Sequence, residues 1–209
     1  MRMRYTASNI PSLKNRTVFF DANSLIYIFW PTTPDSEKAD DYGSILAALI
    51  KNNVNLAVNE IVLSEIINRI LRIEFGKTGL NKDEFKNFRD SESGKSVQND
   101  IYMIIKNRIL SRFKVINEIL SKEEIDSMLI TSKLDFNDKL IEQLCKKKNM
   151  LLLTHDFDFS SSDVDILSAN MKFRFSGQAR KWQKNFYSCF IYLAEIYPEP
   201  RQDLCLKPV

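Results

Sequence analysis

The sequence predicts an α/β domain with a mostly parallel sheet, and two observations carry this prediction. Short apolar runs alternate along the chain with longer segments of helical periodicity, which is the order of strand–helix–strand units. The chain has 209 residues, of which 44% are hydrophobic, so it is long enough to bury a core of its own. We therefore expect one globular domain to which further segments are attached.

Four short apolar runs are predicted to form the strands of this sheet. They are TVFF (17–20), VNLAV (54–58), MLLL (150–153) and VDIL (164–167). Runs of this length with little polar alternation are typical of strands that are covered on both faces, as parallel strands are. Residues 1–16 show no such run and are interpreted as a polar lead-in.

The segments between these runs are predicted to be helical. In EIVLSEIINRILRIEF (60–75), the apolar side chains follow one stripe at helical spacing. Residues 76–134 show little strand character, so we expect a helical insertion there, with a loop at DSESGKS (90–96). Further helices are expected at 22–30, where the prolines of PTTP stop the helix, and at 36–52, 97–113 and 135–148.

The composition excludes several classes of protein. The three cysteines lie far apart and include no CxxC pair, which indicates neither a disulfide framework nor a cysteine zinc site. No apolar run approaches the ~20 residues of a membrane span, and the N-terminus lacks the apolar core of a signal peptide. We expect a cytoplasmic protein with no membrane partner. The net charge of +3 neither demands nor excludes a nucleic-acid partner.

Acidic side chains follow the predicted strands at the points where these strands end. Asp21 comes directly after 17–20, and Asp156 and Asp158 come shortly after 150–153. Because ligands of parallel sheets bind beyond the carboxyl ends of the strands, we expect these carboxylates to share one crevice. Glu65 and Asp138, near the starts of two helices, are placed to join them.

Each of these acids also has a simpler explanation. Glu65 and Arg69 are four residues apart and form a routine surface pair on a helix. Asp135 and Asp138 fit a helix cap and a first-turn acid, Asp21 fits a cap, and the DFD segment fits a turn. His155, the only histidine, has no partner for a zinc site nearby in sequence and is interpreted as solvated or hydrogen-bonded.

Taken together, the acids point to a cation. Two unit charges ~4 Å apart repel by roughly 4 kcal/mol at an effective dielectric near 20, so four or five converged carboxylates need a counter-ion. Oxygen ligands match Mg²⁺ or Mn²⁺, and such ions support hydrolysis of phosphodiesters.

Four segments of the chain carry a resemblance to a known family: FFDANSLIYIF, LAVNEIVLSEIINR, DFNDKLIEQLCKKKNMLLLTHDFDF and VDIL. In this order they resemble the PIN domain, a family of metal-dependent ribonucleases that includes VapC-like toxins. This resemblance implies a three-layer α/β/α fold, one or two Mg²⁺ or Mn²⁺ ions, and cleavage of RNA. It places the catalytic acids at Asp21, Glu65, Asp138 and Asp156, with Asp158 as a further metal ligand and Asn23 and Thr154 in support. Glu60 and Asp135 are the competitors of Glu65 and Asp138.

The resemblance also implies partners, and it leaves alternatives. If the protein is a toxin, an antitoxin is expected at the acidic crevice, and homodimers are common in the family. A non-catalytic scaffold that binds RNA or protein is the alternative. An aspartyl-phosphate phosphatase is disfavoured, because Asn23 stands where that class needs a second aspartate.

We expect a lead-in at 1–16, a catalytic domain at 17–170 and a C-terminal extension at 171–209. The extension is predicted to be helical and mixes basic with aromatic residues, which favours RNA contact through Arg180, Lys181 and Lys184. A helix packed by its aromatic side chains explains the same pattern.

Overall fold

A computed structural model describes residues 2–30 and 36–173 of the chain. The residues up to Phe173 form one compact unit. The predictions made for Arg180, Lys181, Lys184 and the rest of the C-terminal extension beyond Phe173 lie outside the described residues.

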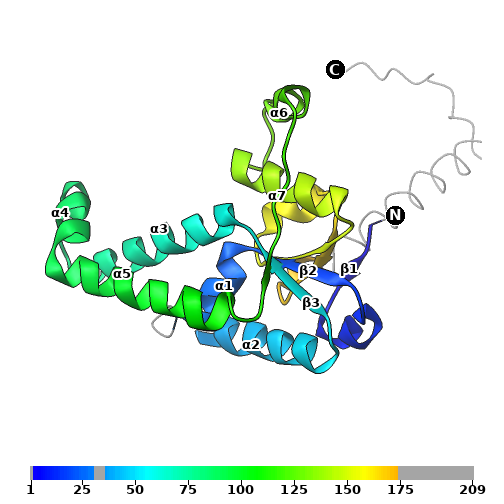
Figure 1. The fold of residues 1–209 in the computed structure, drawn as a ribbon, viewed down its shortest axis with the longest axis horizontal. Helices are drawn as coiled ribbons and strands as arrows, with labels where there is room; N and C mark the ends of the chain where they lie inside the picture. The colour runs from blue at the N-terminus through cyan, green and yellow to red at the C-terminus, as the bar shows by residue number, and fades with distance from the viewer. Residues whose placement is uncertain (1, 31–35, 174–209) are drawn as a thin grey trace, which may run out of the picture. The chain divides into compact units, whose positions relative to one another are not determined.

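The core of this unit is a six-stranded sheet in which every paired strand runs parallel (Figure 1). The strand order is β1-β6-β5-β2-β3-β4. The strands are β1 (Arg4–Tyr5), β2 (Thr17–Phe20), β3 (Asn55–Val58), β4 (Lys114–Val115), β5 (Leu151–Leu153) and β6 (Asp165–Leu167). This parallel sheet with its helices confirms the predicted α/β fold.

The register of the central strands places the ends of β2 and β5 side by side. Phe20 lies opposite Leu153, so Asp21 and Thr154 are the next residues on the two strands. The chain leaves β2 toward β3 on one side and returns to β5 on the other. The carboxyl ends of β2 and β5 are therefore at the point where the strand order reverses, which is where parallel sheets bind their ligands.

The helices predicted between the strands are present. They are α1 (Ala22–Phe29), α2 (Ser36–Lys51), α3 (Glu60–Gly76), α4 (Phe85–Asp90), α5 (Glu92–Ile104), α6 (Lys122–Met128) and α7 (Phe136–Lys147). Helices α3 and α5 lie side by side and extend away from the sheet, with α4 at their far end (Figure 1). No helix in the described ranges is long and apolar enough to cross a bilayer.

Two short edge strands were not predicted. Strand β1 arises within residues 1–16 and pairs with β6, and a 3-10 helix (Ala7–Leu13) follows it. Ile10 and Leu13 on that helix are buried in the core, so this segment is part of the domain rather than a polar lead-in. Strand β4 pairs with β3 from within the insertion. Strands of two residues show no periodicity, because alternation needs a longer run.

The insertion also differs from prediction at its loop. The loop expected at 90–96 is wrong: α4 ends at Asp90, and α5 begins at Glu92 after a break at Ser91. The Ser91 hydroxyl accepts a hydrogen bond from the Gly94 N–H at 3.2 Å and caps α5. At Gly94, a Cβ atom would lie 2.0 Å from the Phe88 carbonyl oxygen, so the tight turn requires glycine. The helix predicted at 97–113 ends earlier, in a π-helix at Ile105–Ile109.

Candidate acidic site at the carboxyl edge of the sheet

Asp21 is the most deeply buried of the predicted site acids. Asp21 directly follows β2 and is the N-cap residue of α1, and it is only 4% exposed. The Ala22 N–H donates to one carboxylate oxygen at 2.7 Å, and the Asn23 amide lies 3.5 Å from the other. The carboxylate is therefore both a helix cap, as the simpler explanation predicted, and a fixed group at the sheet edge.

Thr154 connects Asp21 to the loop that follows β5. Its hydroxyl donates to Asp21 Oδ2 at 2.8 Å and accepts from the Asp156 N–H at 2.9 Å. Thr154 is fully buried, so both bonds are shielded from water. One hydroxyl thus bonds the carboxylate of one predicted ligand and the backbone of another, so Thr154 is placed where a supporting residue would act.

Asp156 and Asp158 occupy the turn after β5, but they differ in how firmly they are held. Asp156 caps the 3-10 helix η4 (Phe157–Ser161) by accepting from the Asp158 N–H at 2.9 Å. The residue Asp156 is partly buried, whereas Asp158 is exposed. The DFD segment is therefore a capped turn. Its first acid, Asp156, is also held by the hydrogen bond from its backbone N–H to the Thr154 hydroxyl.

Asp138 lies in the first turn of α7 and forms a reciprocal cap with Asp135. The Asp138 N–H donates to Asp135 Oδ1 at 2.9 Å, and the Asp135 N–H donates to Asp138 Oδ2 at 3.3 Å. Asp135 is the N-cap residue and is exposed, while Asp138 is partly buried. The cap assigns Asp135 a structural task, which favours Asp138 as the site acid.

Glu65, on α3, forms an ion pair with Arg69 at 3.1 Å. The two side chains are 28% and 44% exposed, so this is the surface pair that four-residue spacing predicts. Glu60 is exposed in the first turn of α3, where Asn59 caps the helix by accepting from the Val62 N–H. Glu65 rather than Glu60 also acts electrostatically on Asp21.

The pKa values show that these acids share one electrostatic environment. The pKa of Asp21 is raised to about 6, mainly by burial and also by the charge of Glu65, while the Thr154 hydrogen bond lowers it. Burial also raises the pKa of Asp138 to about 7, with contributions from Asp135, Asp21 and Asp156. The charge of Asp21 is therefore coupled to that of Glu65, and the charge of Asp138 is coupled to those of Asp21 and Asp156.

Sequence reasoning missed Tyr42, which lies behind the site. This fully buried α2 side chain donates from its hydroxyl to the Thr154 carbonyl at 3.1 Å. The same oxygen lies 3.1 Å from His155 Nδ1 and 3.3 Å from the Ser168 hydroxyl. His155 is thus a hydrogen-bonded residue, as its simpler explanation predicted. The sequence of α2 gave no sign of these hydrogen bonds, because a tyrosine in an apolar helix stripe is equally explained as a residue that only packs in the core.

The donor chemistry of the site fits a hard divalent cation. Its candidate ligands are all carboxylates, which Mg²⁺ and Mn²⁺ prefer. A bound cation would offset both the burial and the smaller repulsion that raise the pKa values of Asp21 and Asp138. Within residues 2–30 and 36–173, no three His, Cys, Asp or Glu side chains are grouped closely enough to hold an ion. The acids are coupled electrostatically, but Asp138 and Glu65 are engaged locally, by the Asp135 N–H and by Arg69.

The fold and this edge define an α/β protein with an acidic site at the switch point of a parallel sheet. The model of the PIN domain matches residues 18–164, which include all five predicted metal ligands. The chain belongs to the PIN domain family.

Solved and curated proteins add little beyond this. The chain is similar to a crystal structure of VapBC2 from Rickettsia felis bound to a DNA fragment from their promoter, with 17% identity and a TM-score of 0.46. The match covers 73% of this chain and 98% of that one. No curated protein matches the chain.

Proposed function

We propose that the protein is a Mg²⁺- or Mn²⁺-dependent endoribonuclease that hydrolyses RNA phosphodiester bonds. The observation that carries the proposal is the Thr154 hydroxyl, which joins the Asp21 carboxylate to the Asp156 backbone at the switch point of the sheet. Membership of the PIN family supports the same chemistry. A buried hydroxyl that bonds one carboxylate and the backbone of a second acid is typical of a site in which ligand direction matters.

In this proposal, Asp21, Glu65, Asp138 and Asp156 hold the ion, with Asp158 beside them. A bound divalent ion supplies positive charge for the phosphodiester oxygens and lowers the pKa of water. The Asp21 carboxylate is fixed in direction by hydrogen bonds from the Ala22 N–H and the Thr154 hydroxyl. Because it is buried, it is shielded from bulk water. Asp138 and Glu65 approach from helices, and each must leave or share its present partner, Asp135 or Arg69, to serve as a ligand.

The test is digestion of a single-stranded RNA with and without Mn²⁺, comparing the parent protein with Asp156→Asn. The parent is expected to cut only with the metal, and the variant to cut in neither condition. Asp163→Asn, an exposed acid outside the cluster, is the control. Equal cutting by the parent and Asp156→Asn would show that the site is assigned wrongly.

A non-catalytic scaffold that binds RNA or protein is the second candidate. It is favoured by the side-chain directions of the acids, because no three of them in the described ranges are grouped for an ion. Isothermal titration with Mn²⁺ separates the two functions. The nuclease binds the ion through Asp21 and loses it in Asp21→Asn, whereas a scaffold releases no heat in either form.

An antitoxin partner and a homodimer stay predictions. The resemblance to VapC-like toxins motivates both, and the VapBC2 structure concerns that protein rather than this chain. Co-expression with the product of a neighbouring small reading frame is the direct test. Inhibition of RNA cutting by that product would support the toxin assignment, and cutting at an unchanged rate would contradict it.

A further inference from the structure

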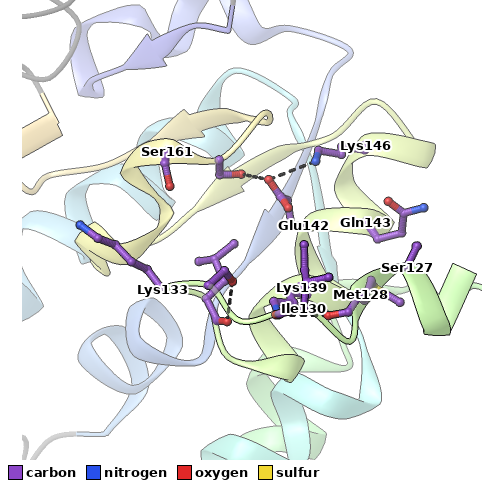
Figure 2. A pocket seen from close by; sticks show the side chains of 12 residues that line it. Ser127, Met128, Ile130, Lys133, Lys139, Glu142, Gln143, Lys146 and Ser161 are labelled. Atoms are coloured by element: carbon purple, nitrogen blue, oxygen red, sulfur yellow. Dashed lines mark hydrogen bonds and ion pairs between the residues drawn. The ribbon is translucent and has the colours of Figure 1, made fainter.

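A cavity of about 320 Å³ lies beside the acidic site, between α7, the loop after α6 and the end of η4 (Figure 2). Its volume is within the roughly 300–1,000 Å³ range of ligand pockets. Figure 2 shows Lys133 and Ser161 at one end, Ser127 and Gln143 at the other, and Glu142 between them.

The lining of this cavity is rich in groups that donate hydrogen bonds. Three lysines (Lys133, Lys139 and Lys146), four serines and Gln143 face one carboxylate, Glu142. The four serines are Ser127, Ser132, Ser161 and Ser162. A lining with three cations and one anion favours an anionic ligand, and hydroxyl, amide and ammonium donors match phosphate oxygens.

Glu142 does not repel such a ligand strongly, because its charge is already balanced. Lys146 Nζ lies 3.2 Å from Glu142 Oε1, and the same oxygen accepts from the Ser162 hydroxyl at 2.7 Å and from the Asp163 N–H at 3.0 Å. These bonds tie α7 to the chain after η4, so they build the wall of the cavity.

Lys139 and Lys133 differ in how they are used. The Lys139 ammonium donates to the carbonyls of Met128 and Ile130 and closes the end of α6, so it is a structural group. Lys133 is exposed and makes no hydrogen bond or ion pair within the described part of the chain, and the same holds for the Ser161 hydroxyl. These two side chains are available to a ligand.

The cavity and the acidic site share two elements. Asp138 is one helical turn before Glu142 on α7, and Asp158 is on the same short η4 helix as Ser161. A nucleic-acid strand that binds at the acids and continues along α7 and η4 therefore passes the cavity. The cavity lies along these two elements and offers an uncommitted cation, Lys133, and an uncommitted hydroxyl, Ser161.

We propose that this cavity binds a phosphate group of the RNA strand whose other linkage occupies the acidic site, through Lys133 and Ser161. This inference rests on the proposed nuclease function and names a second contact of the same substrate. Phosphate contacts of this kind set the register of the strand and carry no base preference.

The experiment measures binding of a fluorescein-labelled 12-nucleotide single-stranded RNA by anisotropy in EDTA, so that no cutting occurs. Lys133→Gln and Ser161→Ala are compared with the parent over a salt series. Lys86→Gln is the matched control, since Lys86 is an exposed lysine on α4, which lies at the far end of α3 and α5 from the sheet. All three positions are exposed, so the variants are expected to fold.

Loss of one phosphate contact lowers the slope of log affinity against log salt by about 0.7 for a single strand, which is about fivefold in affinity near 0.1 M salt. Lys133→Gln is expected to show both changes, Ser161→Ala a smaller loss of affinity with an unchanged slope, and Lys86→Gln neither. Equal slopes and affinities in the parent and Lys133→Gln, or no RNA binding by the parent, would overturn the inference.

The two proposals fail in different ways. If Lys133→Gln weakens binding but Asp156→Asn cuts as the parent does, the cavity binds RNA and the acidic site is assigned wrongly. If Asp156→Asn abolishes cutting while Lys133→Gln leaves binding and its salt slope unchanged, the nuclease function stands and the cavity is not a phosphate site.

Discussion

The acidic site has a strand side and a helix side, and they are held in different ways. On the strand side, Asp21 and Asp156 follow β2 and β5 and are joined by the buried Thr154 hydroxyl. On the helix side, Glu65 and Asp138 are partly buried, and each is bound to a partner close to it in sequence, Arg69 or Asp135. The difference teaches that the bonds of one buried hydroxyl hold the first pair together before any ligand arrives, whereas the second pair must exchange local partners to join it.

The largest effect is expected from Asp21→Asn, on the strand side. Changes to groups that only support a metal ligand cost roughly 10–100-fold in activity or affinity, so loss of the ligand itself is expected to lower RNA cutting by at least ~100-fold. Asparagine keeps the shape and removes a buried charge, so the free energy of unfolding at pH 7 should not fall. The measurement is a cutting rate beside a urea melt. A variant that cuts normally would break the strand side of the comparison.

The strand side also predicts a pH dependence of the metal-free protein. The pKa of Asp21 rises from 3.8 to about 6 on folding, so the folded state holds the proton more tightly. Stability from this group is complete below about pH 4 and is lost as the pH rises through 6, by about 3 kcal/mol at 1.36 kcal/mol per pKa unit. Urea unfolding in EDTA from pH 4 to 8 should show this fall, and Asp21→Asn should reduce it. Parallel curves for the two proteins would contradict the prediction.

Thr154→Val removes the hydroxyl that joins the two strand-side acids and keeps the shape of the side chain. The Asp156 N–H loses its acceptor and Asp21 loses a donor, which is expected to cost ~2 kcal/mol of stability and about 10–100-fold in cutting. Thr154→Ser retains the hydroxyl and should restore most of both losses. Failure of serine to rescue would assign the effect to packing instead of hydrogen bonding.

On the helix side, Asp135→Ala tests the division between cap and ligand. Loss of an N-cap is expected to cost ~1 kcal/mol, measured by thermal or urea unfolding. Asp135→Ser keeps a capping oxygen and should restore stability with near-parent cutting, whereas Asp138→Asn should lose cutting. If Asp135→Ser is as inactive as Asp21→Asn, then Asp135 rather than Asp138 is the ligand.

The smallest effect is expected from Arg69→Ala. An exposed i,i+4 pair contributes under about 0.5 kcal/mol, so the unfolding free energy should barely change. A matched control is Lys95→Ala, which breaks the exposed pair with Glu92 on α5. A large loss of stability in Arg69→Ala alone would show that the helix side is as firmly built as the strand side.

Long apolar runs and strong helical stripes could be predicted from the sequence, while short or interrupted elements could not. The stripe of α3 and the runs of β2 and β5 show their burial in their own periodicity. β1 and β4 have two residues each, so only their pairing with β6 and β3 defines them. The residues around Ser91 were predicted to form a loop. In the structure, the Ser91 hydroxyl cap and the close packing at Gly94 join α4 directly to α5.

By itself, the sequence determined which acids follow which strands, because parallel strands bring their carboxyl ends to one edge. It also determined the caps at Asp21 and Asp135, since capping depends on residues next to each other. Only the tertiary structure decided that Thr154 bonds Asp21 across 133 residues of chain, that Tyr42 lies behind this pair, and that Lys133 faces a cavity beside α7. The physical reason is that side-chain periodicity reports which face of an element is buried. It does not report which distant group a buried hydroxyl or an exposed cation will meet.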